Sequence, residues 1–272
     1  MNADKLELLY EDNHIIAVVK PVGVLSQGDG SGAPDMLSLL SDNIAGRRGK
    51  PGKAFVGLIH RLDRNVGGAM FFAKTSKGAS RAGEDMRSGN FYKGYLALTH
   101  NMLPGNDEGF LRNRLKKDEK RNMVYESEDG KDCVLYYKYI CSFGSADPGD
   151  VGNADEKHIY FAVPVTGRSH QIRAQFAIAE APLIGDNKYG HRSVNGWDIG
   201  LWSSLASMRR TVDRSERIWV KSIPEGELWR TGRSFFPERA KDFILTAEAE
   251  KLLITIKNET REIFRGTDGD TE

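Results

Sequence analysis

The segment of this sequence best suited to chemistry runs from Leu58 to Asn65 and reads LIHRLDRN. An apolar stretch ends here in a cluster of polar residues, and no helical period spreads them over a surface. Side chains two residues apart on a strand share one side, so we expect Arg61 and Asp63 to lie together. Neighbouring positive charge favours the ionised form of Asp63, which suits a nucleophile or a base and does not suit a general acid. The alternative is a salt bridge at a strand end, which the spacing taken alone favours.

Further segments fit one pattern together with this one. The octet is followed by GGAMFFAKT, and the chain also contains, in order, LLYEDNHIIAVVKPVGVL, FYKGYLALTH, RLKKDEKRNMV and VTGRSHQIRAQFA with APLIGDNKYG. These five ordered matches over about residues 6–205 resemble the RluA-type pseudouridine synthases, whose motifs are His-Arg-Leu-Asp, Lys-x-Tyr-x-Ala, Gly-Arg-x-His-Gln-Ile-Arg and Gly-Asp-x-x-Tyr-Gly. The ordered set is far more specific than any one of its members.

The resemblance implies an isomerase that converts particular uridines of ribosomal or transfer RNA to pseudouridine. It implies that Asp63 is the catalytic aspartate, that Tyr95 stacks on the target base and that Arg173 pairs with the catalytic carboxylate. It also implies that Arg61 enters the RNA and helps to evict the uridine. Further RNA contacts are implied for a set of polar and basic residues: His60, Arg64, Lys93, Arg168, Lys116 and Lys117.

Plainer interpretations of the same residues stay open. Tyr95 alternates with leucines in a strand, which is typical of half-buried packing, and Arg173 taken alone is a solvated helix charge. The basic run 112–121 holds six basic and two acidic residues and is by default a solvated stretch, as is GRRGK at 46–50. Phosphate contact is reasonable for both runs given the family.

The implied chemistry needs no cofactor. Uracil is detached from ribose, rotated and rejoined through carbon, without redox change or hydrolysis. An ionised carboxylate could attack C1′ or remove a sugar proton, and the sequence does not choose between these. The target must leave its stack, so we expect a base-flipping pocket and an aromatic ring worth about 1–3 kcal/mol of stacking.

Cofactor and metal signatures are absent from the sequence. GDGSG at 28–32 lacks the spacing of phosphate-binding or dinucleotide-binding loops. His60 and His170 have no third ligand at useful spacing, so no metal site is expected. Cys133 and Cys141 lie about 26 Å apart along one expected strand at ~3.3 Å per residue, which is beyond disulfide reach.

Three positions depart from the family pattern. Val66-Gly67-Gly68 stands where Thr-Ser-Gly is usual, Gln175 where histidine is common, and Trp202 at the histidine of a Leu-His-Ala block. None of them removes a proposed catalytic side chain. The departures indicate a divergent branch and put the identity of the RNA in doubt.

The elements that must position these residues form an α+β fold. We expect two strands around the Asp-Asn turn near residue 12, helices after residues 35, 76 and 169, and strands over 54–59, 67–74, 91–100, 133–142 and 158–165. Strands with interspersed helices predict a mainly antiparallel mixed sheet with flanking helices, in two sub-halves around a central catalytic cleft. We expect one catalytic domain over 1–272, with a helical elaboration at 206–265 and a frayed tail at 266–272.

Bulk composition is that of a globular protein, with 39% hydrophobic and 28% charged residues in 272. No apolar run approaches the ~20 residues that span a bilayer, and the acidic N-terminus differs from a secretory signal. We therefore predict a cytoplasmic protein without membrane contact, and a monomer by default. The net charge of +1 argues against a strongly basic coating. Relatives carry a small S4-type module before the first hairpin and this sequence has no room for one, so RNA choice is expected from loops 46–53 and 112–121.

Two rival functions remain. A non-catalytic RNA-binding or ribosome-assembly protein on the same fold would explain the altered catalytic turn and the low net charge. A hydrolase using Asp63 on a small glycoside or phosphoester would want a second carboxylate or a metal, and no motif supplies either. Comparing pseudouridine maps of cells with and without the gene separates the isomerase from the binding protein.

Overall fold

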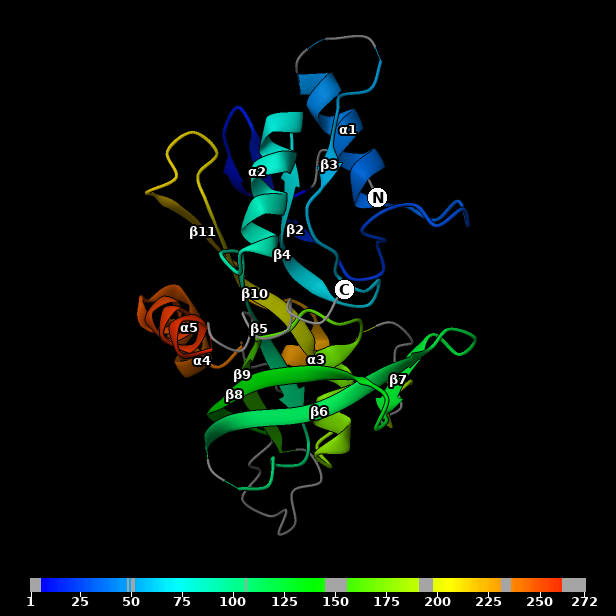
Figure 1. Cartoon of the computed structure of the whole chain (residues 1–272), viewed down its shortest axis with the longest axis vertical. Helices are drawn as coiled ribbons and strands as arrows, with labels where there is room; N and C mark the ends of the chain where they lie inside the picture. The colour runs from blue at the N-terminus through cyan, green and yellow to red at the C-terminus, as the bar shows by residue number, and fades with distance from the viewer. Residues whose placement is uncertain are drawn as a thin grey trace. The chain divides into compact units, whose positions relative to one another are not determined.

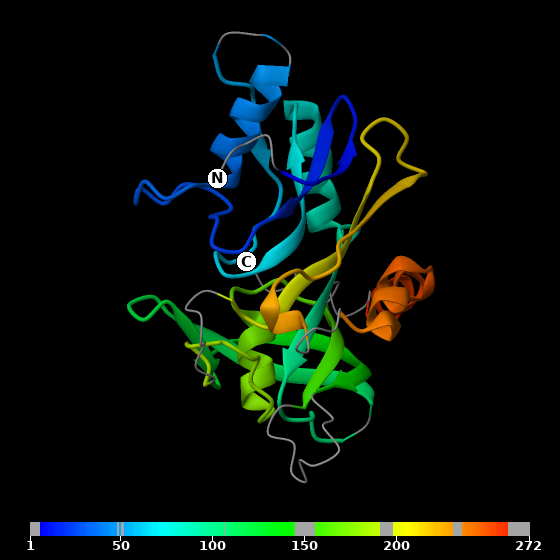
Figure 2. The same ribbon diagram turned by 180° about the vertical axis from the view of Figure 1, so that it is seen from behind.

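The computed structural model describes residues 6–47, 49, 52–105, 107–144, 156–190, 198–230 and 236–260. The chain forms two compact units, and neither of them is continuous in sequence. Unit 1 comprises Met1–Lys93 and Ser203–Ser222, and unit 2 comprises Gly94–Trp202 and Ile223–Glu272. In Figures 1 and 2 the yellow strands of unit 1 lie beside its blue and cyan strands, so its sheet joins two distant parts of the chain.

Unit 1 is built on a sheet whose strands run in the order β1, β2, β4 and β10, with β3 paired to β4 and β11 paired to β10. Its strands are β1 (Leu8–Glu11), β2 (Ile15–Lys20), β3 (Gly57–Leu58), β4 (Gly67–Ala73), β10 (Leu201–Arg209) and β11 (Arg217–Lys221). The pairing of β2 with β4 is antiparallel and sets Ile16 opposite Phe72. Every residue of β2 and β4 is buried, so both faces of this central pair are covered.

Two helices belong to unit 1, α1 (Met36–Arg47) and α2 (Ser76–Arg87). The hydroxyl of Thr75 caps α2 by accepting a hydrogen bond from the backbone N–H of Gly78 at 3.1 Å. A Cβ atom at Gly78 would lie 2.5 Å from the carbonyl oxygen of His14. The glycine therefore lets the first turn of α2 approach the β1–β2 turn closely.

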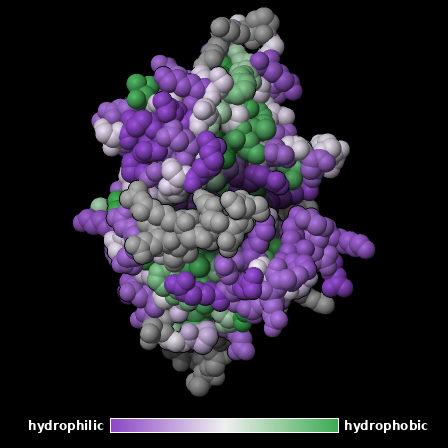
Figure 3. Space-filling model, viewed as in Figure 1, coloured by the Kyte–Doolittle hydropathy of each residue, from purple (hydrophilic) through white to green (hydrophobic). Residues whose placement is uncertain are grey.

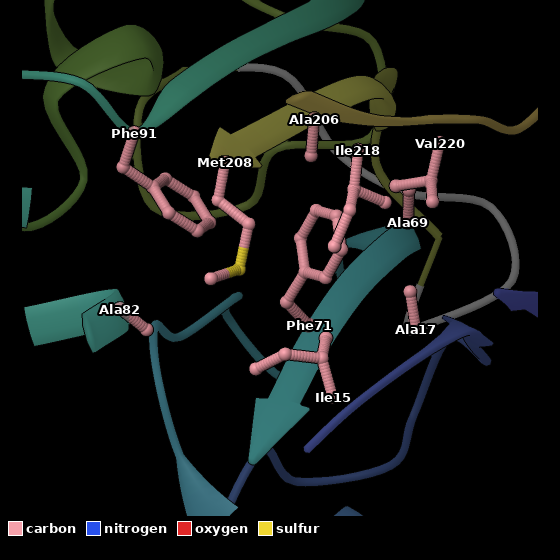
Figure 4. Packing of buried hydrophobic residues seen from close by; sticks show 10 residues of the cluster. All are labelled: Ile15, Ala17, Ala69, Phe71, Ala82, Phe91, Ala206, Met208, Ile218 and Val220. Carbon is pink, nitrogen blue, oxygen red and sulfur yellow. The ribbon is translucent and has the colours of Figure 1, made fainter. Parts of the chain in front are cut away.

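The core of unit 1 combines side chains from both parts of the chain. Figure 4 shows Phe71 of β4 with Ile15 and Ala17 of β2 on one side and residues of β10 and β11 on the other. The buried cluster consists of Ile15, Ala17, Ala69, Phe71, Ala82, Phe91, Ala206, Met208, Ile218 and Val220. Four of these ten come from the segment after residue 202, so unit 1 depends on that segment for its core.

Unit 2 contains the rest of β5, which begins in unit 1, and a sheet in the order β5, β9, β8, β6 and β7. The strands are β5 (Tyr92–Thr99), β6 (Glu108–Asp118), β7 (Met123–Glu126), β8 (Lys131–Phe143) and β9 (Lys157–Pro164). The helical elements are α3 (Gln171–Ile178), η2 (Glu227–Trp229), α4 (Glu238–Leu245) and α5 (Glu248–Glu259). The pairings β5–β9, β8–β9, β6–β8 and β6–β7 are all antiparallel.

Helices cover both faces of the unit 2 sheet. Tyr160 packs edge-on against Phe176 of α3, with ring centroids 5.8 Å apart. Its neighbour Phe161 packs against Phe243 of α4, with centroids 5.0 Å apart. Adjacent strand residues point to opposite faces, so α3 and α4 lie on opposite sides of β9.

The α+β fold class with a mainly antiparallel sheet is confirmed, and two sequence predictions need correction. The basic run 112–121, expected as a connection, lies largely in β6, because the charges alternate with half-buried side chains along a strand. The region 206–265 was expected to be helical, but it continues β10 and contains β11 before the helices begin at Glu238. The expected tail 266–272 lies outside the described residues.

Candidate active site

Asp63 lies in unit 1, on a tight turn between β3 and β4. The backbone N–H of Val66 donates to the carbonyl oxygen of Asp63 at 3.0 Å and closes the turn. The preceding Leu62 is buried, and its backbone is held at both ends by the hydroxyl of Ser26. That hydroxyl donates to the Leu62 carbonyl at 2.7 Å and accepts from its N–H at 3.0 Å. Asp63 itself is half-buried, so its backbone is fixed on both sides while its side chain keeps some access.

Lys20 lies beneath this turn and is fully buried at the end of β2. Its ammonium donates to the carbonyl oxygens of Val24 at 2.7 Å, Pro21 at 2.9 Å and Arg64 at 3.3 Å. Burial lowers the pKa of Lys20 to about 7, and the charge of Asp63 acts in the opposite direction. The lysine thus joins the loop after β2 to the Asp63 turn and places a cation near the carboxylate.

Arg61 and Arg64 flank Asp63 and differ in their surroundings. Arg61 is exposed, as a side chain that reaches into RNA would be. Arg64 is half-buried, and its Nε donates to the carbonyl oxygen of Gly23 at 3.0 Å. The carbonyl of Arg64 accepts from the N–H of Gly23 at 2.8 Å, so this arginine braces the turn.

His60 is 5% exposed and lies inside unit 1. Its Nε2 accepts a hydrogen bond from the backbone N–H of Phe71 at 3.0 Å, and its ring packs against Phe91 at 5.0 Å. Burial, assisted by the charge of Lys93, lowers the pKa of His60 to about 3, so the imidazole is neutral. This placement gives His60 a structural role and does not fit the direct RNA contact expected from the sequence. Lys93 is half-buried, and burial lowers its pKa.

Strand β10 leaves no room for a side chain at Gly68 in β4. Its φ angle is +113°, and a Cβ atom there would lie 2.3 Å from the carbonyl oxygen of Ser203 on β10. The hydroxyl of Ser203 also donates to the carbonyl of Ala69 at 2.9 Å. The contact between β4 and β10 therefore requires glycine at position 68, two residues after the Asp63 turn ends at Val66.

Tyr95 and Arg173 belong to unit 2 and are both buried. Tyr95 lies in β5 opposite Ala162 of β9. Arg173 lies in α3, where it makes a bidentate ion pair with Asp186, with Nε–Oδ2 at 2.7 Å and Nη2–Oδ1 at 2.8 Å. The solvated helix charge that its isolated spacing suggested is wrong, because the guanidinium is 4% exposed and its partner Asp186 is fully buried.

Tyr189 organises the surroundings of Arg173. Its ring lies 5.3 Å from the guanidinium carbon, and its hydroxyl accepts from the backbone N–H of Val124 at 2.8 Å. The same hydroxyl lies 3.0 Å from Nδ1 of His170, the residue before α3. The block GDNKYG thus supplies both Asp186 and Tyr189 to the arginine.

The remaining basic residues lie on the surface of unit 2. Lys116 pairs with Asp129, and Lys117 pairs with Glu119 at 2.6 Å. Arg168 lies exposed in the turn after β9. Over the part of the chain that the structure describes, no group of three His, Cys, Asp or Glu side chains is placed to hold a metal. Within the same residues, no helix is long and apolar enough to cross a bilayer.

The motifs of the sequence indicate Asp63 as the candidate catalytic residue and assign no role to Lys20 or Asp186. Both lie in segments that carry the family resemblance, and a charged residue at the end of an apolar run is the signal that could have indicated them. From the local sequence alone, Lys20 resembles the solvated end of an apolar strand. Its contact with the carbonyl of Arg64 joins residues 44 positions apart, so no local pattern indicates it.

Comparison with known proteins decides the family. The family model for RNA pseudouridylate synthase matches residues 14–178. The chain belongs to this family. Lys20, Asp63, Tyr95 and Arg173 all lie within the matched residues.

Curated members of the pseudouridine synthase family resemble this chain over about two thirds of its length. The ribosomal large subunit pseudouridine synthase C of Rickettsia prowazekii (strain Madrid E) is 28% identical over 190 residues, which cover 69% of this chain and 57% of that protein. The protein of that name from Escherichia coli (strain K12) is 31% identical over 194 residues, covering 68% of this chain and 53% of that protein. The chain therefore spans somewhat more than half the length of these relatives.

Solved structures of the family share the fold. Human RNA pseudouridylate synthase domain containing 1 matches with a TM-score of 0.63 at 18% identity, covering 82% of this chain and 85% of that chain. Human RNA pseudouridylate synthase domain containing 4 matches with the same TM-score and identity, covering 82% and 91%. The resemblance to pseudouridine synthases stated from the motifs is thus confirmed.

Residues at the three departures from the family pattern are buried. Val66 is buried, as is Trp202 in β10. Gln175 is fully buried, and its amide donates to the carbonyl oxygen of Leu111 at 3.0 Å and to Oδ1 of Asn113 at 2.9 Å. Val66 belongs to unit 1, whereas Gln175 and Trp202 belong to unit 2.

Proposed function

We propose that this chain isomerises uridine to pseudouridine in RNA, with Asp63 as the catalytic residue. The observation that carries the proposal is the Asp63 turn, which the hydroxyl of Ser26 and the ammonium of Lys20 hold within the matched family region. In this reaction the C1′–N1 bond of the uridine breaks, a C1′–C5 bond forms, and the proton lost from C5 is balanced by one gained at N1.

The residues of each unit support a part of this chemistry. A carboxylate at Asp63 can act as a nucleophile or a base at C1′ or C2′, and Lys20, Arg61 and Arg64 lie in or beside the turn that carries it. Tyr95 is the proposed stacking partner of the detached uracil, and Arg173 supplies positive charge on a guanidinium that Asp186 holds rigidly. Arg61, exposed beside Asp63, is the proposed side chain that enters the RNA.

The RNA is proposed to be that of the large ribosomal subunit, because the curated relatives are named for it. Exposed basic side chains at Lys116, Lys117 and Arg168 are proposed contacts for its phosphates. A monomeric state and a cytoplasmic location remain predictions of the sequence.

The decisive variant is Asp63→Asn, which keeps the size of the side chain and removes its charge. Unmodified transcripts of large-subunit ribosomal RNA and of transfer RNA are incubated with the purified chain, and pseudouridine is mapped by chemical labelling and primer extension. We expect the wild type to modify defined positions and Asp63→Asn to lose at least on the order of 10⁴ in turnover, as when an essential catalytic side chain is removed.

The matched control is Asp42→Asn, an exposed carboxylate on α1. It should retain the turnover of the wild type, and circular dichroism should show both variants folded. Normal turnover by Asp63→Asn would refute the catalytic role. Absence of pseudouridine with the wild type on every RNA would favour the non-catalytic binding protein.

A further inference from the structure

A groove with a volume of about 820 Å³ lies wholly within unit 2. It is formed by β6, by the turn that leads from β7 to β8, and by the turn after β9. Its lining residues are Arg112, Asn113, Arg114, Glu126, Ser127, Glu128, Asp132, Cys133, Val134, Thr166, Gly167 and Arg168. This size is within the range of sites that hold a small organic ligand.

Two arginines of the groove keep their charge available. Arg112 is exposed and lies with its guanidinium carbon 5.4 Å from the ring centre of Phe110. Arg168 is exposed in the turn after β9. Among the described residues, neither has a carboxylate within ion-pair distance, whereas the nearby Arg114 lies 3.7 Å from Asp132. Arg112 and Arg168 can therefore receive an anion without breaking an internal pair.

The turn that carries Arg168 is held rigidly from below. The backbone N–H of Arg168 donates to Oε1 of Gln171 at 3.1 Å, and that oxygen also accepts from the hydroxyl of Thr166 at 2.9 Å. Gln171 donates in turn to Oε1 of Gln175 at 3.0 Å, and Thr166 accepts from the N–H of Val134 at 3.1 Å. This buried network fixes the backbone of Arg168 before any ligand arrives.

Carboxylates face the same groove as the arginines. Glu126 accepts from the amide of Asn113 at 2.9 Å, which fixes its direction, and Glu128 and Asp132 add two more acceptors to the lining. A site for a simple anion would exclude such groups, since like charges repel. A nucleotide fits both signs, because its phosphate needs cations while the amino group of its base donates to carboxylates. Figure 3 shows hydrophilic residues gathered over β6 and β7, as a surface for a charged strand requires.

We propose that this groove binds one nucleotide of an RNA strand, with its phosphate on Arg112 and Arg168 and an amino-bearing base facing Glu126 and Glu128. The inference rests on the proposed function for the class of polymer, and it adds a subsite that contacts the RNA outside the target uridine. The groove thereby gives the chain a preference among neighbouring nucleotides.

The test uses the full chain and two labelled single-stranded probes, ten cytidines and ten uridines, with binding followed by fluorescence anisotropy at several salt concentrations. The variant R112A/R168A should weaken binding of both probes at least tenfold, and should lower the slope of log Kd against log salt by about 0.7 for each phosphate that is no longer bound, as expected for a single strand. The matched control R239A/K251A removes two exposed cations on α4 and α5 and should change Kd less than twofold. Unchanged binding by R112A/R168A would overturn the proposal, and so would an equal weakening in the control.

The base-facing carboxylates have their own readout. E126A/E128A should lower the preference for the cytidine probe over the uridine probe severalfold, because only cytosine offers an amino group to those oxygens, whereas the loss of negative charge acts on both probes alike. Equal effects on both probes would overturn the assignment of the base. If R112A/R168A unfolds, the same measurement is made with R112Q/R168Q, which keeps part of the aliphatic portion of each side chain.

The outcomes for the groove and for the catalytic proposal are distinguishable, because binding is measured without turnover. Pseudouridine formation by the wild type, together with unchanged RNA binding by R112A/R168A, would refute the groove proposal and leave the catalytic proposal standing. Normal turnover in Asp63→Asn with weakened binding in R112A/R168A would remove the catalytic assignment alone. If the groove binds an acidic protein segment instead, R112A/R168A will leave the Kd of both RNA probes unchanged.

Discussion

At the scale of single residues, Lys20 shows how a buried amine supports the Asp63 turn. Three carbonyl oxygens and the charge of Asp63 stabilise its ammonium, while burial favours the neutral amine and lowers its pKa to about 7. The carbonyl ligands come from both loops that meet at the turn. Removing the ammonium would leave buried carbonyl groups without a donor.

A pH-dependent stability follows from this pKa. The folded pKa of about 7 lies below the ordinary 10.5, so between these values the unfolded chain binds more protons at Lys20 than the folded chain does. The contribution of this group to the free energy of unfolding therefore rises with pH from about 7 to about 10.5, by at most about 1.4 kcal/mol per pH unit. Urea unfolding of the wild type and of Lys20→Met at pH 6, 7.5 and 9 measures it. The difference between the two proteins should change in favour of the wild type as pH rises, and a pH-independent difference would contradict the assignment.

The pair of Arg173 and Asp186 makes a second prediction at this scale. Both side chains are buried, so Asp186→Asn removes the charge from one side of a buried bidentate pair and should lower the free energy of unfolding by about 3–5 kcal/mol. Glu216→Gln breaks the exposed pair with Arg210 and serves as control, with a much smaller effect because water screens that pair. Chemical denaturation of both variants checks this. Similar decreases in the two would show that the buried pair is not specially important.

The prediction for Asp63 could be made from the sequence alone, because its motif is local and contiguous, and its role stays a prediction. The supports of the site could not be predicted in the same way. Lys20 meets Arg64 across 44 residues, and Gly68 meets Ser203 across more than a hundred, so their roles depend on tertiary contacts that local patterns do not encode. His60 shows the converse case, since its place in the motif suggested RNA while its packing against Phe91 buries it.

At the scale of elements, the contact between β4 and β10 determines which residue can follow the Asp63 turn at position 68. Gly68→Ala should destabilise the protein in two ways, through its positive φ and through the contact of the new Cβ with the Ser203 carbonyl. Gly105→Ala is a close control, because its φ of +106° is similar and no heavy atom lies within 4 Å of a Cβ placed there. The backbone term of about 1–2 kcal/mol is common to both, so the excess in Gly68→Ala measures the clash. Equal melting temperatures for the two variants would contradict the close approach.

Elements with a clear period were predicted well, and those with mixed signals were not. The hairpin of β1 and β2 and the helices after residues 35, 76 and 169 lie close to where their patterns place them. The charged residues at 112–121 did not indicate β6, because charged side chains that alternate with half-buried ones along an exposed strand resemble a solvated run in the sequence. The segment of β11 reads RIWVK, with Ile218 and Val220 buried, yet it was grouped with the helices that follow it. Short strands near helical sequence are the cases in which tertiary pairing decides.

At the scale of the whole molecule, both units are made from separated pieces of chain. Unit 1 needs Ser203–Ser222, which supplies Ala206, Met208, Ile218 and Val220 to the cluster around Phe71. A fragment that stops at Lys93 therefore leaves one side of Phe71 without partners. Burial of an aliphatic side chain contributes about 1.5–3 kcal/mol, so the removal of four apolar partners is comparable to the whole stability of a small unit.

This interleaving predicts how fragments of the chain will behave. The fragment 1–93 should be unfolded or aggregated, whereas the fragment 1–222 retains every strand of unit 1 and should keep its core. Amide dispersion in two-dimensional NMR, or protection of the backbone amides of β2 and β4 from hydrogen exchange, distinguishes these states. Adding a synthetic peptide of residues 201–222 to fragment 1–93 should restore protection in β4, because it returns β10 and β11 to the sheet. A cooperatively folded 1–93 would show that the first 93 residues suffice to form the Asp63 turn, and that the later strands only cover it.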